Sequence, residues 1–240
     1  MKPAAGKPRR VQVLNTYEKM LKPASLPELV YKTIRSAIMN GIYKPGEMLR
    51  QEELAKSLGV SRAPLREALP KLEADGIVKL LPRRGYVVVS LEPEEIKEIF
   101  ELRLLIEKHA ATIATKLRTD QDVLRAKSIY EQMIALDIND PQQKAQWYAL
   151  NSDFHEALLR PSGREHFMRA ITSLRTAVEP YIRMEIDLTG DVEEANDEHQ
   201  KMLSAFANQE VEKIQEYTEK HIKNTTKRLL SGLENKQQQA

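Results

Sequence analysis

The sequence predicts a mostly α-helical protein in two parts, on two observations. Apolar residues recur at helical spacing over most of 26–74 and again throughout the chain from Leu91 onward, whereas residues that favour strands concentrate at 77–90. The charge is also divided. Residues 1–90 contain 17 Lys and Arg against 8 Asp and Glu, a net +9, and residues 91–240 contain 20 against 27, a net −7. A length of 240 residues permits one large domain or two smaller ones.

Three short helices are expected in the N-terminal part. An apolar stripe predicts a first helix that ends at Asn40-Gly41, and Lys44-Pro45-Gly46 forms a turn. Leucines at helical spacing then predict a second helix over 51–58 and a third over 62–74, which stops near Asp75-Gly76. These three helices follow one another closely enough to share one small core.

The junction between the second and third helices is the most informative segment. Gly59 can adopt the positive φ of a tight turn, Ser61 can cap the third helix, and Pro64 lies in its first turn, where no hydrogen bond is lost. Arg62 and Arg66 then lie one turn apart on one face. A helix that begins with exposed arginines after such a turn suits the DNA major groove. The alternative is an ordinary αα-hairpin with a solvated basic face.

A basic hairpin is expected directly after the third helix. Residues 77–81 and 85–90 are predicted strands, the second containing three consecutive valines, and Pro82-Arg83-Arg84-Gly85 joins them. Three helices followed by a basic hairpin form a winged helix-turn-helix, here residues 26–90, with Arg83 and Arg84 at the tip of the wing. The residues expected to contact DNA are Arg50, Ser61, Arg62, Pro64, Arg66, Arg83, Arg84 and Gly85.

Residues 26–90 resemble the DNA-binding domain of the GntR family of bacterial transcription regulators. The matching residues are Gly41, Pro45-Gly46, Leu49, Glu52, Leu54-Ala55, Leu58 to Arg62, Pro64, Arg66 to Leu69, Leu72, Gly76 and Arg84-Gly85. The resemblance implies that the partner is double-stranded operator DNA. One departure is Pro70, which removes a backbone hydrogen bond inside the third helix and should bend it. Arg62 and Arg66 precede this position, so we expect DNA contact to remain.

The remainder of the chain predicts an all-α helical bundle over residues 91–232. Pro93-Glu94-Glu95 begins its first helix, and further helices are expected near 120–137, 142–160, 164–187, 192–207 and 210–232. Pro180 should kink the helix that contains it. Residues 233–240 are expected to form a C-terminal tail, in which Lys236 to Ala240 should fray.

The N-terminus and the composition add further expectations. Residues 1–25 form a basic arm, with a possible helix over 11–21, that is either a floppy tail or a DNA-touching segment. The absence of cysteine excludes disulfides and thiolate metal sites. No apolar run approaches membrane-spanning length and the chain begins without an apolar signal core, so we expect a soluble, cytoplasmic protein with no membrane partner.

Four polar residues of the helical part are candidate metal ligands. Asn151 and His155 lie at i and i+4 on one expected helix, and His199 and His221 lie on two later ones, each beside apolar residues. Three imidazoles and an oxygen could hold a divalent ion such as zinc or nickel. By spacing alone, these histidines could equally be hydrogen-bonded core groups or surface groups.

Residues 91–232 are similar to the all-helical effector domain (FCD) of the FadR-like branch of the GntR family. Many members bind a metal through an Asp or Asn four residues before a His, in a D/N-x-x-F-H segment, and through two later histidines. The resemblance therefore assigns the metal to Asn151, His155, His199 and His221. The amide of Asn151 should bind a cation less strongly than a carboxylate would. His109 and His166 fit neither pattern and are interpreted as structural.

Arginines of the same domain are candidates for binding an effector. Arg103 lies among apolar residues, where an arginine is costly unless it is paired. It could form an i,i+4 salt bridge with Glu107, or it could bind the carboxylate of an effector above the metal, as an arginine of this helix often does in the related domains. Arg175 and Arg183 are weaker candidates, on the helix that contains Pro180.

Together these features predict a homodimeric, ligand-responsive transcription regulator of the GntR family that responds to a small carboxylate effector and is not an enzyme. Dimerisation would place two DNA-binding heads on a near-palindromic site. Two alternatives use the same residues: a regulator that senses the metal itself, and a metal-dependent hydrolase. The hydrolase hypothesis leaves the basic N-terminal part without a role.

Overall fold

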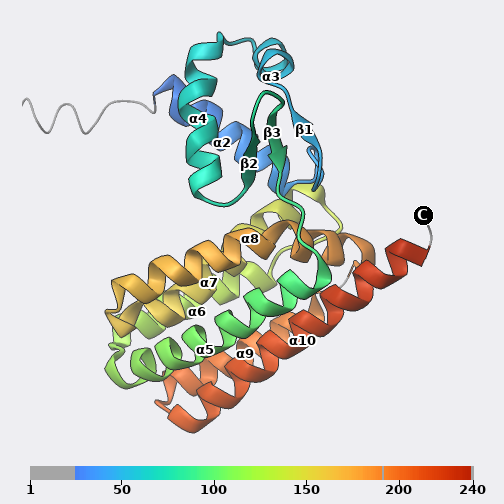
Figure 1. The fold of residues 1–240 in the computed structure, drawn as a ribbon. Coiled ribbons are helices and arrows are strands. Elements are labelled where there is room, and N and C mark those ends of the chain that lie inside the picture. Colours follow the sequence, from blue (N-terminus) through green and yellow to red (C-terminus); the bar gives the residue numbers. More distant parts are fainter. Residues whose placement is uncertain (1–24, 191, 239–240) are drawn as a thin grey trace, which may run out of the picture.

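The computed structural model describes residues 25–190 and 192–238. A small head of three helices and a three-stranded sheet is followed by a larger, entirely helical domain (Figure 1). The mostly α-helical fold predicted from the sequence is therefore confirmed. The predicted basic arm, including its possible helix over 11–21, lies outside the described residues apart from Ser25.

The head contains the three predicted helices and the wing. Its elements in chain order are α2 (Leu26–Met39), β1 (Met48–Leu49), α3 (Gln51–Leu58), α4 (Arg62–Ala74), β2 (Val78–Leu81) and β3 (Gly85–Val88). The sheet is antiparallel with the order β1-β3-β2, and Met48 pairs with Val87 while Val78 pairs with Val88. Ile34, Leu65 and Leu69 are completely or almost completely buried in the core between the helices and the sheet.

The turn between α3 and α4 has the predicted backbone. Gly59 ends α3 with φ +66°, which a residue with a side chain rarely adopts. Ser61 is the N-cap of α4 with an extended backbone, but its side chain makes no capping hydrogen bond, so that part of the prediction is wrong. Ser61 is exposed on the surface of the head. Helix α4 continues through Pro70 to Ala74.

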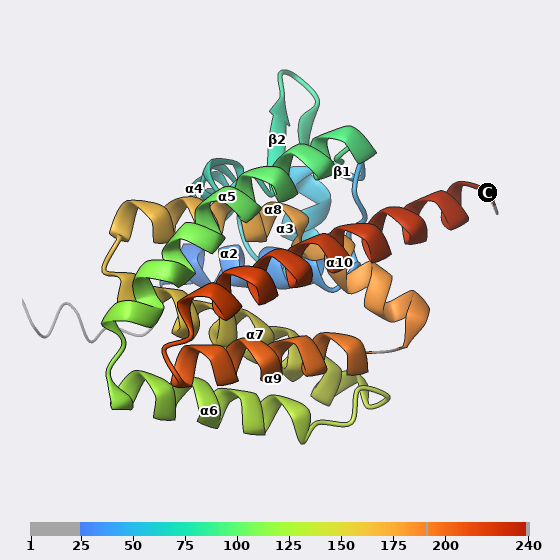
Figure 2. The same cartoon turned by 90° about the horizontal axis from the view of Figure 1, so that it is seen from below.

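The second domain contains the six predicted helices. They are α5 (Pro93–Leu117), α6 (Asp120–Ile134), α7 (Pro141–Leu159), α8 (Glu165–Thr189), α9 (Glu193–Ala207) and α10 (Val211–Gln238), with a 3-10 turn, η1, at Arg160–Ser162. Helix α10 lies beside α5 in both views, and α8 is the helix nearest the head (Figures 1 and 2). The predicted frayed tail is instead helical as far as Gln238, because α10 continues past residue 232.

The helical domain has its apolar core between these helices. Phe154, Phe206 and Ala114 are fully buried in the largest apolar cluster, and a second cluster around Ile96 and Val178 lies closer to the head. Helix α8 contains Pro180 and continues on both sides of it. Across residues 25–190 and 192–238, no helix combines the length and the apolar character that crossing a bilayer requires.

Candidate functional site

The basic surface of the head is formed by α4 and the residues just before α3. Arg62 and Arg66 are both exposed, one turn apart. Arg62 forms an ion pair with Glu52 at 3.0 Å, and Arg50 forms one with Glu53 at 3.2 Å, all four side chains being largely exposed. Exposed ion pairs of this kind are weak, so these guanidinium groups can exchange a carboxylate for a phosphate at little cost.

The wing presents Arg83 and Arg84 at its tip. Both are exposed, and the turn is closed by a hydrogen bond from the Arg84 amide to the Leu81 carbonyl oxygen at 3.0 Å. Gly85 has φ +108°, and a Cβ there would lie 3.2 Å from the Leu49 carbonyl oxygen, so a larger residue would disturb the β1–β3 pairing. Pro64, in contrast, is buried on the inner side of α4. It supports the first turn of the helix and its side chain cannot contact DNA.

Three histidines from three different helices meet inside the helical domain. His155 on α7, His199 on α9 and His221 on α10 are 3%, 0% and 6% exposed. Their ring centroids lie 4.8–5.0 Å apart in each pair, and one ligand atom from each residue lies within 4.8 Å of the other two. The sequence predicted these three residues as a set, and the structure brings them together.

Burial favours the neutral form of all three imidazoles. Burial lowers the pKa of His155 and of His199 well below 6.5, and the nearby guanidinium of Arg175 acts in the same direction. Burial also lowers the pKa of His221, although its hydrogen bond to Glu198 opposes this effect. Neutral imidazole is the form that offers a lone pair to a metal ion, so the cluster is ready to bind one without first losing protons.

The positions of the donor atoms fit a divalent ion. The Nε2 atoms of His155 and His199 lie 3.2 Å apart, and two nitrogens bound to one zinc at about 2.0–2.1 Å lie roughly 3.3 Å apart. The Oδ1 atom of Asn151, one turn before His155 on α7, is buried and has no hydrogen-bond partner among the described residues. A buried acceptor without a partner is costly, and a cation would satisfy it. The three buried histidines could thus hold a metal ion.

His221 has a further partner on α9. Its Nδ1–H donates to Oε2 of Glu198 at 2.8 Å, and Oε1 of the same carboxylate accepts from Nδ2 of Asn224 at 2.5 Å. Glu198 is only 7% exposed. Glu198 directly precedes His199 in the sequence, but spacing alone does not show that it contacts His221 on the next helix.

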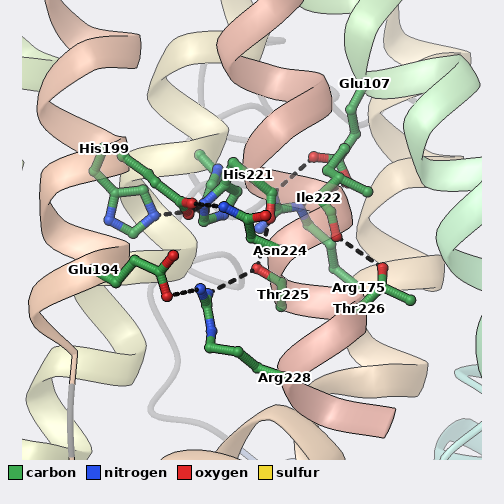
Figure 3. A network of polar contacts seen from close by, with 12 residues as sticks. Glu107, Arg175, Glu194, His199, His221, Ile222, Asn224, Thr225, Thr226 and Arg228 are labelled. Carbon is green, nitrogen blue, oxygen red and sulfur yellow. Dashed lines mark hydrogen bonds and ion pairs between the residues drawn. The ribbon is translucent and has the colours of Figure 1, made fainter. Parts of the chain in front are cut away.

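A cavity of about 120 Å³ opens beside the imidazoles. Asn151, the three histidines, Arg103 and Arg175 all line it. Its remaining walls are Trp147, Ile182, Glu185, Ile186, Thr189, Glu194, Ala195, Thr225 and Arg228. Figure 3 shows the polar network here, with Glu107 and Arg175 on one side of His221 and the Glu194–Arg228 pair on the other. The space exceeds what a single water needs and suits a ligand of a few heavy atoms.

Two arginines share one buried carboxylate at the edge of this cavity. Nε of Arg103 donates to Glu107 Oε1 at 2.8 Å, and Arg175 donates to both Glu107 oxygens, at 3.1 Å and 2.7 Å. The predicted i,i+4 pair of Arg103 with Glu107 is therefore present. Nη1 of Arg103 is buried and has no partner among the described residues. The triad leaves one net positive charge and a free donor in a residue that lines the cavity.

Arg183 does not line this cavity and lies at the junction between the two domains. Its Nη1 donates to Oδ1 of Asn40 at the end of α2, at 2.7 Å, and its Nε donates to Glu179 at 3.0 Å. Glu179 also pairs with Arg35 of α2 at 3.5 Å, and the Arg183 guanidinium lies over the ring of Tyr148. Helix α8 thus carries Arg175 at the cavity and, one and two turns further on, the residues that hold the head.

The linker between the head and α5 is attached to the same helix. The amide of Leu91 donates to the hydroxyl oxygen of Tyr181 at 2.5 Å. Tyr181 is buried and packs against Ile96 and Phe100 of α5. The end of the wing is therefore fixed to α8 next to Pro180.

Comparisons with known proteins agree with both halves of this arrangement. Residues 26–88 match the family of bacterial regulatory proteins, gntR family, and residues 98–224, more than half of the chain, match the FCD domain. The chain belongs to the GntR family of transcription regulators. It is a GntR-family regulator whose helical domain is an FCD domain.

Several known transcription regulators are similar to this chain over most of their length. The HTH-type transcriptional regulator YdhC of Bacillus subtilis is 28% identical over 219 residues, which cover 90% of this chain and 96% of YdhC. The gluconate operon transcriptional repressor of Bacillus licheniformis is 28% identical over 195 residues, 79% of each chain. Among solved structures, McbR/YncC of E. coli has the same fold, with a TM-score of 0.73 at 22% identity over 86% of this chain and 98% of that one.

Proposed function

We propose that this GntR-family protein is a sequence-specific DNA-binding regulator whose helical domain binds a divalent metal ion and a small carboxylate effector. One observation carries the proposal. Three neutral, buried imidazoles and the unpaired Oδ1 of Asn151 line the same cavity as two arginines. Its similar relatives are regulators, and we propose a regulatory, non-catalytic role for the metal. A cytoplasmic location follows from the proposed partner, operator DNA.

Zinc and nickel are among the metals that this donor set favours. Imidazole suits zinc, copper, iron and nickel, and the absence of a carboxylate ligand argues against magnesium, calcium and manganese. His155, His199 and His221 would hold the ion through nitrogen, with Asn151 as a weak oxygen ligand. A bound ion would supply a Lewis acid for an anionic oxygen of the effector.

The effector site combines this ion with two guanidinium groups. Arg103 has a buried Nη1 without a partner, and Arg175 lines the same cavity while holding Glu107. A carboxylate is the group that a guanidinium and a cation recognise together. The volume of about 120 Å³ favours a small organic acid, and we propose that the regulated genes serve the metabolism of such an acid. The relative from Bacillus licheniformis is named as the repressor of a gluconate operon.

Replacement of Arg103 tests the effector site separately from the metal. Arg103→Ala is expected to leave the metal content unchanged and to abolish the effect of small carboxylates on operator binding, because it removes the free Nη1 donor. Arg103→Lys, which keeps the charge but not the planar fork, should retain part of the response. Operator binding by fluorescence anisotropy, with and without a panel of small carboxylates, measures both variants. A wild-type response in Arg103→Ala would exclude this arginine from the site.

Helix α4 and the wing are the proposed DNA-contacting surface. The exposed Arg62 and Arg66 would enter a major groove, while Arg83 and Arg84 would contact phosphates or a minor groove. The solvated basic face of an ordinary αα-hairpin would offer the same charges without sequence preference. A preference for operator over DNA of random sequence that is lost when an arginine of α4 is removed distinguishes the two.

Removal of one arginine of α4 should weaken operator binding by a measurable amount. Arg66→Ala, like Arg62→Ala, should weaken operator binding by about 1–3 kcal/mol, because a bidentate base contact or a phosphate contact is lost. Anisotropy titrations at fixed salt concentration provide the measurement. Arg125→Ala is the matched control, since Arg125 is an exposed arginine of α6 on the other domain. Operator affinity equal to wild type in a folded Arg66→Ala protein would contradict the assignment.

A homodimer is the proposed assembly. A single winged head covers too small a stretch of DNA for tight, specific binding, whereas two heads read two half-sites. Sedimentation velocity at micromolar concentration is expected to give about twice the mass of one chain without operator, and a complex of two chains per operator duplex when DNA is present. A monomer under both conditions would rule out the dimer.

Direct sensing of the metal is the second candidate function, because the three histidines could bind a metal ion without any organic effector. It predicts that zinc or nickel alone changes operator affinity. The proposed effector response requires the carboxylate as well. Metal titrations of operator binding in the absence of any organic acid separate the two.

A further inference from the structure

A buried carboxylate, Glu198, contacts the histidine cluster on the side away from the cavity. It does not line the cavity, and its two oxygens accept from His221 Nδ1 and from Asn224 Nδ2. Resting on the metal site proposed above, we infer that Glu198 is a positioning residue that fixes the tautomer and orientation of His221. It also supplies, from outside the ligand set, the negative charge that Asn151 lacks as a ligand.

The tautomer follows from the chemistry of the partner. An ionised carboxylate only accepts hydrogen bonds, so Nδ1 of His221 must carry the hydrogen in the 2.8 Å contact. A neutral imidazole that is protonated on Nδ1 has its lone pair on Nε2. That nitrogen is therefore the one His221 can offer to an ion shared with His155 and His199. Without Glu198, either tautomer is open to the ring.

The orientation is fixed by a second contact on the same helix. His221 and Asn224 are three residues apart on α10, on neighbouring positions of one face, and Glu198 reaches both from α9. Asn224 can donate only through its amide, which holds Oε1 and leaves Oε2 directed at the imidazole. Helix α9 thus provides one proposed ligand, His199. At the preceding position it provides Glu198, which orients a second proposed ligand, His221.

Glu198 also differs from two other carboxylates near the cluster, Glu107 and Glu194. Glu107 is occupied by two arginines, and Glu194 is paired with Arg228. Glu198, in contrast, contacts a histidine, His221, at 2.8 Å. Three neutral imidazoles and an amide carry no charge, so this buried anion, which contacts the ligand His221, would be coupled to the ion through that ligand. Outer partners of this kind are worth about 10- to 100-fold in metal affinity.

The test replaces Glu198 and measures both the imidazole and the metal. Glu198→Gln keeps the size of the side chain, and Glu198→Ala removes its polar atoms. Asp197→Asn, an exposed neighbour on the same helix, is the control. Long-range nitrogen–proton NMR spectra of the metal-free proteins at pH 8 report the His221 tautomer. Zinc and nickel affinities are measured by competition with a chelator.

The expected results follow from the two roles. Metal-free wild type and Asp197→Asn should carry the His221 hydrogen on Nδ1, whereas the two Glu198 variants should show a mixture of tautomers. Zinc affinity should fall about 10- to 100-fold in Glu198→Ala and by a smaller factor in Glu198→Gln, and remain within about twofold of wild type in Asp197→Asn.

Three outcomes would overturn the inference. They are an Nε2–H tautomer in metal-free wild type, an unchanged tautomer in Glu198→Gln, and wild-type zinc affinity in a folded Glu198 variant. A purely structural link between α9 and α10 would lower the melting temperature without changing the tautomer or the affinity. If Glu198→Ala fails to fold, the isosteric Glu198→Gln decides the question. Failure of wild type itself to bind metal would refute the proposed function. The tautomer of His221 in the metal-free proteins would still test whether Glu198 positions that imidazole.

Discussion

Replacement of His199 by alanine is expected to reduce the bound divalent metal from about one ion per chain to almost none. His199 is completely buried, and its Nε2 lies 3.2 Å from that of His155. Removal of one of three neutral nitrogen donors leaves two imidazoles and an amide oxygen, which is too few strong ligands for a stable zinc or nickel site. Elemental analysis of the purified variants gives the metal content directly.

Two further variants make this experiment specific. His166→Ala is the control, because His166 is an exposed histidine of α8 that contacts Arg169 and lies outside the cluster. It should keep its metal. Asn151→Asp should bind the ion more tightly than wild type, since it replaces a neutral oxygen ligand by a charged one. Full metal content in a folded His199→Ala protein would eliminate the proposed site.

The second large effect is expected at Glu107. Glu107→Gln should lower the free energy of unfolding at neutral pH by about 3–5 kcal/mol, the usual cost of removing one partner from a buried ion pair. The side chain is 2% exposed and holds both Arg103 and Arg175. The amide of glutamine would leave two guanidinium groups without a counter-ion. Urea unfolding followed by circular dichroism measures the difference.

The same carboxylate predicts how acid destabilises the protein. Burial alone would raise the pKa of Glu107, but the guanidinium groups of Arg103 and Arg175 outweigh it and lower the pKa from 4.5 to about 2. A carboxyl group with a depressed pKa in the folded state stabilises the protein above its ordinary pKa. This contribution is lost as the pH falls from about 4.5 to about 2.

Unfolding measurements across that pH range test the assignment. The stability of Glu107→Gln should depend less steeply on pH than that of wild type between pH 4.5 and the onset of acid unfolding, because the variant lacks this titrating group. Glu101→Gln, which changes an exposed glutamate of the same helix, should behave as wild type. If the free energy of unfolding fell equally steeply with pH in Glu107→Gln and in wild type, Glu107 would not contribute the expected pH dependence.

The fold of the head could be predicted from local signals. Gly59 at positive φ and the apolar spacing of α2 and α4 act within a few residues, so the sequence specifies them directly. Strand β1 was missed because two residues, Met48–Leu49, carry no periodicity and become a strand only by pairing with β3. The end of α10 was placed too early because its last residues are polar but favour helix.

The candidate site was predicted unevenly, and the range of each contact explains why. The Arg103–Glu107 pair is an i,i+4 contact on one helix, which spacing reveals. Arg175 reaches the same carboxylate from 68 residues away, a contact that no local pattern encodes. The meeting of the three histidines was expected from the family resemblance, because spacing placed each on an inward face but could not make the faces converge. Arg183 looks equivalent to Arg175 in sequence, yet two helical turns place it at the head.

Helix α8 has a thermodynamic consequence for the cell. It holds Glu107 through Arg175 and the head through Glu179 and Arg183, so occupancy of the cavity and placement of the head share one helix. Linkage between two equilibria is reciprocal. If the effector weakens operator binding by some factor through this helix, operator DNA must weaken effector binding by the same factor. Protein bound at its operator would then respond only at a higher effector concentration than free protein, and the number of operator copies would help to set the threshold of the switch.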